Sequence, residues 1–257
     1  MNGPRLSVNI NKIATLRNSR GGSLPSPSEA ARVCVAAGAR GITVHPRADE
    51  RHITRADVVE LADLLGPARR EVEFNIEGDP RPDLLDLVRK VRPHQCTLVP
   101  VRPGEITSQA GWPPDTPAGG MRAVVSDLRH RGIRVSLFID PRIEAVKWAA
   151  SMGADRVELY TEPFARAFED SEHACARSFN RYVEAANQAS ALGLGVNAGH
   201  DLDLHNLPRL GREVPELAEV SIGHALLADA LYLGLAETVR RYVRACRGEA
   251  VDAPITQ

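Results

Sequence analysis

The chain has 257 residues, of which 43% are hydrophobic and 25% charged, a composition typical of globular proteins and not of disordered or fibrous chains. Its 32 lysines and arginines and 33 acidic residues leave a net charge of -1, so neither nucleic acid nor an anionic membrane is an expected partner. No apolar stretch approaches the roughly 18 residues that a membrane-spanning helix needs.

Short, mainly apolar runs alternate with helical patterns along almost the whole chain. Eight runs of four to six residues are typical of strands buried on both faces: Leu6–Ile10, Gly41–Val44, Val72–Ile76, Cys96–Val99, Arg134–Ile139, Arg156–Tyr160, Gly195–Ala198 and Ala218–Ile222. Helical patterns lie between and after them: Pro27–Ala39, Arg55–Leu65, Pro82–Val91, Met121–Arg131, Pro141–Met152, Ser171–Leu192, Leu204–Arg212 and His224–Cys246.

Strand–helix alternation predicts parallel strands joined by right-handed crossovers. Eight units close naturally into a barrel, whereas five or six would favour an open doubly wound sheet. We therefore predict an α/β protein with a (β/α)8 TIM barrel in a single catalytic domain over residues 1–247, followed by a flexible tail at 248–257. An open sheet is the alternative if some of the short runs are not strands.

Cysteine usage and the N-terminus bear on the cellular compartment. Cys34, Cys96, Cys175 and Cys246 are far apart, follow no metal-binding spacing and lie in apolar stretches, so we expect buried free thiols. The N-terminus lacks a basic segment followed by an apolar run, so no signal peptide is expected. Both features favour a cytoplasmic protein.

Two connections are longer than the usual loop between a strand and a helix. Residues 11–24, after the first strand, contain Arg17 and Arg20, and residues 100–121, after the fourth, are rich in glycine and proline and contain Thr107 and Ser108. We expect binding loops at both places. Disorder is the alternative for the second.

Catalytic groups of such a barrel lie at the C-terminal ends of its strands. In this chain those positions hold Asn9, Asn11, Lys12, His45, Arg47, Glu77, Asp140, Glu158, His200, Asp201 and His224. Histidine changes charge near neutral pH, and burial can raise a carboxyl pKa until the group acts as a base, so the set predicts acid–base catalysis. Any one of these histidines, taken alone, is equally consistent with a structural role.

Glycines at the ends of the last two strands point to an anion site. Gly199 and Gly223 each stand between a strand and a helical pattern, where backbone N–H groups and a helix dipole attract phosphate. Ordinary turn formation is the alternative explanation. We expect a phosphorylated ligand.

Several long motifs in this order resemble the pyridoxine 5'-phosphate synthase family of vitamin B6 biosynthesis. They are VNINKIATLRNSRGG at 8–22, GITVHPRADERHI at 41–53, LVPVRPGEITSQAGW at 98–112, SLFIDP at 136–141, NAGHDL at 197–202 and PELAEVSIGHALL at 215–227. The resemblance covers residues 6–246. It implies a TIM barrel with additional helices, assembled as a homo-octamer.

The family's reaction condenses 1-deoxy-D-xylulose 5-phosphate with 3-amino-2-oxopropyl phosphate, giving pyridoxine 5'-phosphate, phosphate and water, without a metal or organic cofactor. The resemblance implies that His45 and Glu77 accept protons, His200 donates one and Glu158 stabilises a transition state. It assigns the aminoketone phosphate to Asn9, Arg20, Asp201, Gly223 and His224, and the deoxyxylulose phosphate to Asn11, Lys12, Arg47, His52 and Thr107.

Three places depart from the family pattern. Asn11-Lys12 stands where many members have Asp-His, and Tyr160 stands where a histidine is common. Extra sequence precedes Glu77, whose assignment rests on the match of Asn75-Ile76-Glu77. The first change replaces an acid and an imidazole by an amide and a cation, which alters what that pair can do for the substrate. It does not affect His45, Glu77 or His200.

Three other functions remain open from the residues. A metal-dependent epimerase or aldolase would use His45, His200, His224 and the two glutamates as ligands, and chelators would inhibit it. A Schiff-base aldolase would need Lys12, which borohydride would trap on substrate. A non-catalytic sugar-phosphate-binding protein would bind the ligands without turnover.

Overall fold

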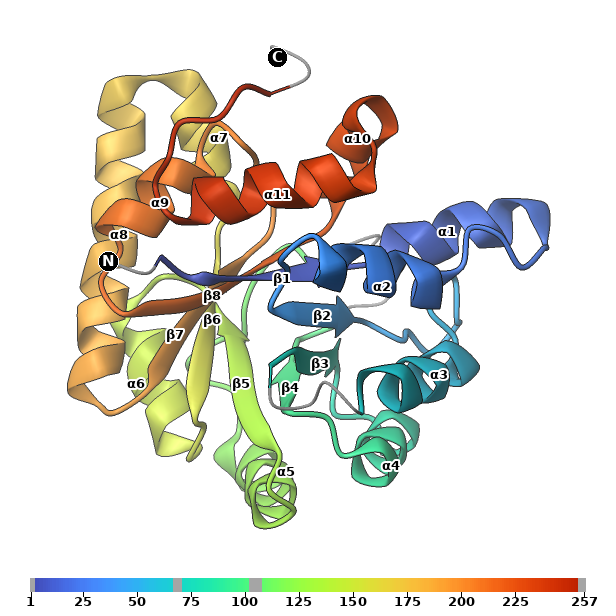
Figure 1. Cartoon of the computed structure of the whole chain (residues 1–257). Coiled ribbons are helices and arrows are strands. Elements are labelled where there is room, and N and C mark those ends of the chain that lie inside the picture. The colour runs from blue at the N-terminus through green and yellow to red at the C-terminus, as the bar shows by residue number, and fades with distance from the viewer. Residues whose placement is uncertain (1–2, 67–70, 102–107, 254–257) are drawn as a thin grey trace.

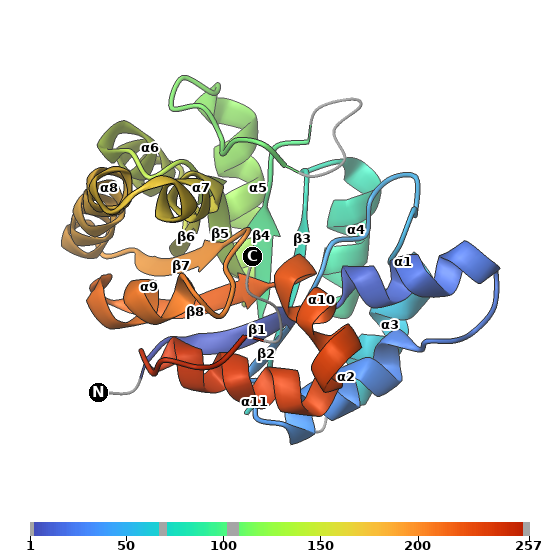
Figure 2. The ribbon, with the colours of Figure 1, turned by 90° about the horizontal axis from the view of Figure 1, so that it is seen from above.

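The computed structural model describes residues 3–66, 71–101 and 108–253. Its strands form one closed parallel barrel in chain order, β1 to β8, with β8 pairing back to β1. Helices surround the strands in both views (Figures 1 and 2). The prediction of a (β/α)8 TIM barrel is therefore confirmed.

The strands lie at or within three residues of the predicted positions: β1 (Arg5–Asn9), β2 (Gly41–Val44), β3 (Glu73–Gly78), β4 (Gln95–Leu98), β5 (Arg134–Ile139), β6 (Arg156–Tyr160), β7 (Gly195–Gly199) and β8 (Leu217–Ile222). The helices are α1 (Asn11–Arg20), α2 (Pro27–Ala36), α3 (Arg55–Leu65), α4 (Pro82–Val91), α5 (Ala118–His130), α6 (Ile143–Ser151), α7 (Glu162–Asp170), α8 (Glu172–Ala191), α9 (Leu207–Glu213), α10 (His224–Leu233) and α11 (Leu235–Cys246).

The helix predictions were wrong in three places. The first long connection is largely α1, whose only buried residue is Ala14, so its sequence carries little apolar periodicity. The short helix α7 was missed, although Phe164 and Phe168 are spaced for one helix face. The last predicted helix is divided into two helices, α10 and α11, because Gly234 between them has a φ of +77°.

The barrel interior, here called the lumen, is polar instead of aliphatic. Gln95 of β4 accepts a hydrogen bond from Asn197 of β7 at 3.5 Å, and these strands are not neighbours, so the bond crosses the lumen. A second row runs around the wall: Ser7 contacts Thr43 at 2.7 Å, and Asn75 donates to Thr43 at 3.4 Å. Most TIM barrels fill this space with branched aliphatic side chains.

The hydrophobic core lies outside the strands, between them and the helices. Alternate strand residues such as Val8, Ile42 and Ile76 are fully buried there. Each strand is thus buried on both faces, as expected, but the face toward the lumen is mainly polar. This arrangement leaves the lumen free to carry chemistry.

Smaller features complete the fold. All four cysteines are buried and free, which confirms that prediction. In the described part of the tail, Val251 and Ala253 pack against the core. Among the described residues, no helix combines the length and the apolar character needed to cross a bilayer.

Candidate active site

A cavity of about 530 Å³ opens at the C-terminal ends of the strands. It brings together twelve of the predicted site residues: Asn9, Asn11, Lys12, His45, Arg47, His52, Glu77, Glu158, His200, Asp201, Gly223 and His224. Arg20, exposed at the end of α1, is not among the lining residues. Thr107 lies outside the described residues.

Two asparagines tie the ends of β1 and β2 together. The Asn9 side-chain oxygen accepts from the backbone N–H of Asn11 at 3.1 Å, where α1 begins. The Asn11 side-chain oxygen accepts from the backbone N–H of His45 at 2.9 Å. The amide of Asn11 therefore helps to position His45, and a carboxylate could accept the same hydrogen bond.

Glu77 and His45 face each other across the cavity floor. His45 Nδ1 lies 3.8 Å from Glu77 Oε2, and the Asn9 amide donates to the same oxygen at 3.4 Å. Burial raises the pKa of Glu77 to about 8, with a further contribution from Glu219, while a hydrogen bond from Ser221 opposes the shift. Such a carboxyl can take up and release protons near neutral pH.

His45 is held as a neutral imidazole. Burial pushes its pKa well below the ordinary value, and the positive charge of Arg47 acts in the same direction. Its Nε2 atom is buried and has no hydrogen-bond partner among the described residues. A buried polar atom without a partner, in a cavity of this size, is suited to contact a bound molecule.

Glu158 supplies the second carboxyl of the cavity from β6. Burial raises its pKa well above the ordinary value, and the nearby Glu77 raises it further. A Cβ atom at Gly199 would lie 2.7 Å from Glu158 Oε1, so glycine at this position leaves room for the Glu158 carboxyl where it now lies. The two carboxyls cannot both ionise cheaply in this environment.

The opposite rim of the cavity carries basic groups. Arg47 is buried, and Lys12 is exposed at the start of α1. His52 is half-buried, and its Nδ1 accepts from the backbone N–H of Ile53 at 2.9 Å. Burial, followed by Arg47 and Lys12, lowers the pKa of His52 to about 4. This rim suits an anionic ligand.

Gly223 and His224 form a second candidate anion position. Gly223 precedes α10, a helix of ten residues whose N-terminus has no side-chain cap. A Cβ atom at Gly223 would lie 3.2 Å from Asn9 Cβ, so the absence of a side chain permits this close approach. The first N–H groups of α10 therefore remain available to an anion.

Arg17 has a structural role instead of a position in the cavity. It donates to Asp57 Oδ2 at 2.9 Å, and Asp57 also closes the capping box of α3 with Thr54. The resulting ion pair anchors α1 to α3.

Sequence reasoning missed six lining residues: Thr15, Arg51, Val99, Ser108, Phe138 and Ser221. Ser221 stands two residues after Glu219, on the same face of β8 in the alternating strand pattern, and hydrogen-bonds Glu77. That periodicity was the available signal. Ser108 is buried beside a segment that lies outside the described residues.

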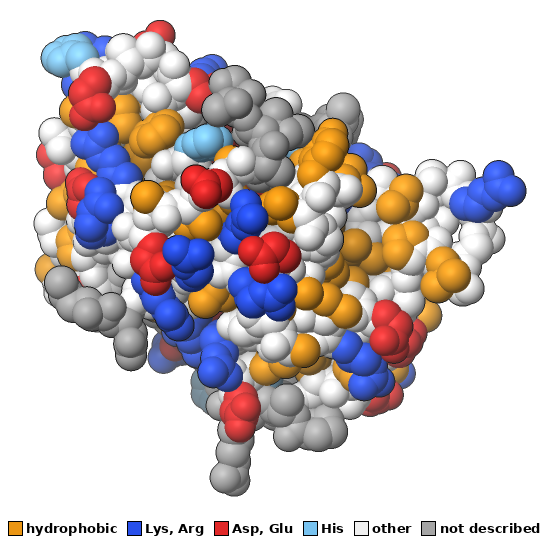
Figure 3. Space-filling model, turned by 45° about the horizontal axis from the view of Figure 1, so that its top comes forward, with side chains coloured by type: hydrophobic (Ala, Val, Ile, Leu, Met, Phe, Trp, Pro, Cys, Tyr) orange, Lys and Arg blue, Asp and Glu red, His pale blue; other side chains and the backbone are white. Residues whose placement is uncertain are grey.

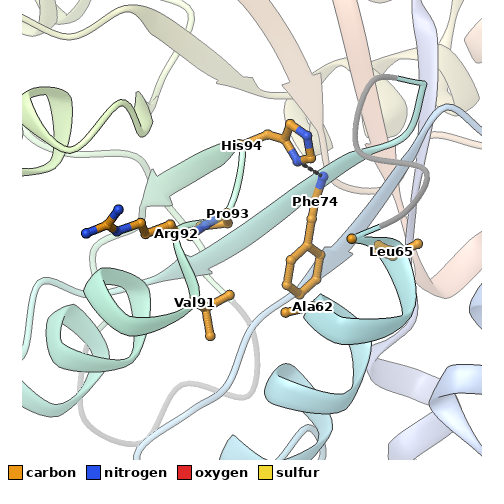
Figure 4. A pocket seen from close by; sticks show the side chains of 8 residues that line it. Ala62, Leu65, Phe74, Val91, Arg92, Pro93 and His94 are labelled. Carbon is orange, nitrogen blue, oxygen red and sulfur yellow. Dashed lines mark hydrogen bonds between the residues drawn. The ribbon is translucent and has the colours of Figure 1, made fainter.

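A further crevice is too small for a substrate. This crevice of about 20 Å³ between α3, β3 and the start of β4 has room for about one water molecule. There His94 Nδ1 accepts from the backbone N–H of Phe74 at 2.9 Å (Figure 4). On the face in Figure 3, basic side chains lie beside acidic ones. Among the described residues, no three His, Cys, Asp or Glu side chains are arranged to hold a metal ion.

Comparisons with known proteins place nearly the whole chain in a family. The family model described as "Pyridoxal phosphate biosynthesis protein PdxJ" matches residues 6–248. A pyridoxine 5'-phosphate synthase of Bacteroides fragilis is 52% identical over 243 residues, covering 95% of this chain and 99% of that protein. One from Leptospira biflexa is 49% identical over 250 residues, covering 93% and 96%.

Similar solved structures are more distant in sequence. Tryptophan synthase from M. tuberculosis superposes with a TM-score of 0.63 at 12% identity, over 96% of this chain and 94% of that one. Phosphoribosyl anthranilate isomerase from Thermotoga maritima gives a TM-score of 0.58 at 13% identity, over 96% and 100%. At such low identity these likenesses concern the fold alone.

Proposed function

This chain belongs to the PdxJ family of pyridoxal phosphate biosynthesis proteins, and we propose that its active site is the cavity at the C-terminal ends of the barrel strands. The reaction condenses 1-deoxy-D-xylulose 5-phosphate with 3-amino-2-oxopropyl phosphate to give pyridoxine 5'-phosphate, phosphate and water. The observation that carries the proposed site is the meeting of His45, Glu77, Glu158 and His200 in one cavity, from four different strand ends.

The chemistry requires repeated proton transfer. The substrate amine attacks the substrate ketone, so the imine joins the two ligands, and loss of water and phosphate with ring closure follows. His45 and Glu77 take protons: the Nε2 atom of His45 has no hydrogen-bond partner among the described residues, and burial raises the pKa of Glu77 to about 8. His200 is neutral because burial lowers its pKa to about 4, so it gives a proton from one ring nitrogen as the other ring nitrogen takes one up.

Glu158 stabilises positive charge that develops on the condensing amine. Its high pKa, caused by burial and then by Glu77, means that ionisation is favoured only when a cation lies beside it. Proximity of the two bound substrates supplies a further share of the rate.

The two phosphates bind at opposite sides of the cavity. The aminoketone phosphate lies at Gly223 and His224 on the N-terminus of α10, with Asn9 and Asp201 beside it. The deoxyxylulose phosphate lies at the basic rim, against residues that share positive charge or hydrogen-bond donors: Asn11, Lys12, Arg47 and His52. Arg20 and Thr107 remain assigned through the resemblance. Arg20 lies away from this cavity in the single chain, and Thr107 is outside the described residues.

Product analysis tests the function. Chelator-treated protein is mixed with both substrates, and the product is identified by mass and ultraviolet spectrum, with Glu77→Gln as the control. We expect pyridoxine 5'-phosphate from the wild type and a near-complete loss in the variant. Product only after metal is added, or a borohydride-trapped adduct on Lys12, would contradict the proposed chemistry.

Assembly and location complete the proposal. We expect a cytoplasmic homo-octamer, as the family resemblance implies. The exposed side chains of Leu24, Leu231 and Tyr232, at 75%, 76% and 67%, are candidates for burial between copies. Light scattering should give eight times the chain mass of 27.9 kDa, and cell fractionation should place the protein in the cytosol. A monomer or dimer in solution would refute the octamer.

A further inference from the structure

One wall of the otherwise polar cavity, at Val99 and Phe138, is apolar. Val99, Phe138 and Tyr160 form a buried cluster separate from the main core. They come from the ends of β4, β5 and β6, and the rings of Phe138 and Tyr160 lie 5.5 Å apart. The rest of the lumen is lined by polar side chains. A contact that this apolar wall makes should therefore explain why it is apolar.

The imidazole of His200 packs against this wall. Its ring centroid lies 5.1 Å from that of Phe138 and 5.4 Å from that of Tyr160, with an edge-on arrangement to the tyrosine. Its backbone has a φ of +85°, a region that non-glycine residues rarely adopt. The Thr161 hydroxyl lies 2.6 Å from the Gly199 carbonyl oxygen and 2.5 Å from that of His200. Backbone and ring are therefore both constrained.

The tyrosine itself is fixed from behind. The Tyr182 hydroxyl, on α8, donates to the Tyr160 carbonyl oxygen at 2.7 Å, and the Tyr160 side chain is buried. Burial raises the pKa of the Tyr160 hydroxyl to about 12, so it stays neutral at physiological pH. What Tyr160 presents to His200 is thus a rigid ring and not a charge.

We propose that Tyr160 and Phe138 are positioning residues for His200: their rings hold the imidazole in one orientation at the cavity and exclude water from it. The inference rests on the proposed function, in which His200 returns a proton to the condensing substrates. Many family members have histidine at the position of Tyr160. The role proposed here needs an aromatic ring and does not need a basic nitrogen.

The titration of His200 supports this role. Burial lowers its pKa to about 4, and Glu162 of α7 acts in the opposite direction. His45 lies in the same cavity, and a charge on His200 would help to lower the pKa of His45. Removing an aromatic ring would admit water, and the pKa of His200 would rise toward its ordinary value of 6.5.

Two variants of Tyr160 separate the ring from the hydroxyl. Tyr160→Phe keeps the ring, so we expect kcat and the His200 titration to match those of the wild type. In Tyr160→Leu we expect kcat to fall about 10- to 100-fold, KM to stay within about threefold, and the His200 pKa to rise by about one unit or more. The pKa is measured by NMR of the imidazole C–H signals, assigned with His200→Gln.

Phe138→Leu provides an independent variant, with the same expected changes. Unfolding curves check that each variant is folded before it is compared. Equal losses in Tyr160→Phe and Tyr160→Leu would overturn the proposal, because the hydroxyl would then be the required group. An unchanged His200 titration in folded Tyr160→Leu and Phe138→Leu would also overturn it. Failure of the wild type to form product would instead refute the proposed function, since the titration needs no substrate.

Discussion

Strand β3 carries two buried glutamates at opposite ends of its lumen face, and their surroundings differ. Glu73, at the lower end, pairs with Arg5 at 3.1 Å and with Arg134 at 2.5 Å. Glu77, at the upper end, faces the His45 imidazole at 3.8 Å and an amide at 3.4 Å. Both side chains are almost equally buried. Burial therefore does not distinguish a structural carboxyl from a catalytic one; the partners do.

The difference follows from what each end must do. Arginine partners at the lower end offset the cost of taking a carboxylate out of water, so Glu73 contributes to folding. At the upper end no comparable compensation is built around Glu77, and its raised pKa is the consequence. The lower end is not uniformly compensated, because burial, followed by Glu73, also raises the pKa of Glu219 to about 8.

Replacing Glu77 gives the largest expected effect. Glu77→Gln keeps the shape and removes the proton acceptor, so we expect kcat to fall about 10²- to 10⁴-fold. The free energy of unfolding should be unchanged or higher, because no buried acid then has to ionise. Steady-state kinetics and urea unfolding measure both. A variant that loses stability as well as activity would contradict the comparison.

The pH dependence comes next in size. If Glu77 must be ionised to act, kcat/KM falls about tenfold per pH unit below a pKa near 8. A plateau that extends down to pH 6 would refute this assignment.

The raised pKa of Glu77 also makes the free energy of unfolding depend on pH, in a direction that can be predicted. Between pH 4.5 and about 8 the unfolded chain ionises this carboxyl while the folded protein keeps it protonated, so its contribution to stability falls as pH rises. We therefore expect Glu77→Gln to gain stability relative to the wild type on going from pH 5 to pH 8. Thermal unfolding at both pH values is the measurement.

Glu73→Gln tests the other end of the strand. Its arginine partners are 43% and 30% exposed, so the loss should be below the several kcal/mol of a fully buried pair, at about 1–3 kcal/mol of unfolding free energy. We expect kcat of the folded enzyme to stay within about twofold of the wild type. A large loss of kcat with unchanged stability would place Glu73 with Glu77 in the catalytic group.

The middle of the lumen should give the smallest effect. Thr43→Val keeps the shape but removes the hydroxyl that contacts Ser7 at 2.7 Å and accepts from Asn75 at 3.4 Å. We expect a loss of about 1 kcal/mol in unfolding free energy and no change in kcat. A drop in kcat as large as that of Glu77→Gln would show that the hydroxyl row is coupled to the chemistry.

Much of this protein was determined by local sequence. Short, mainly apolar runs alternating with helical patterns placed all eight strands, because those signals depend only on near neighbours. The strand-end rule then identified His45, Glu77, Glu158 and His200, since all parallel strands of a barrel end on one side. Helix α1 was not predicted because its sequence lacks an apolar stripe. Asp57 of α3 helps to hold this helix in place through its ion pair with Arg17.

Only the tertiary structure decided which polar residues are paired and which are not. Glu73 and Glu77 are the same residue type four positions apart, and nothing local in the sequence tells that arginines from β1 and β5 reach one while a histidine after β2 reaches the other. The apolar cluster of Val99, Phe138 and Tyr160 beside His200 likewise comes from three separate strand ends. A pKa depends on burial and on neighbours in space, and closure of the barrel sets both.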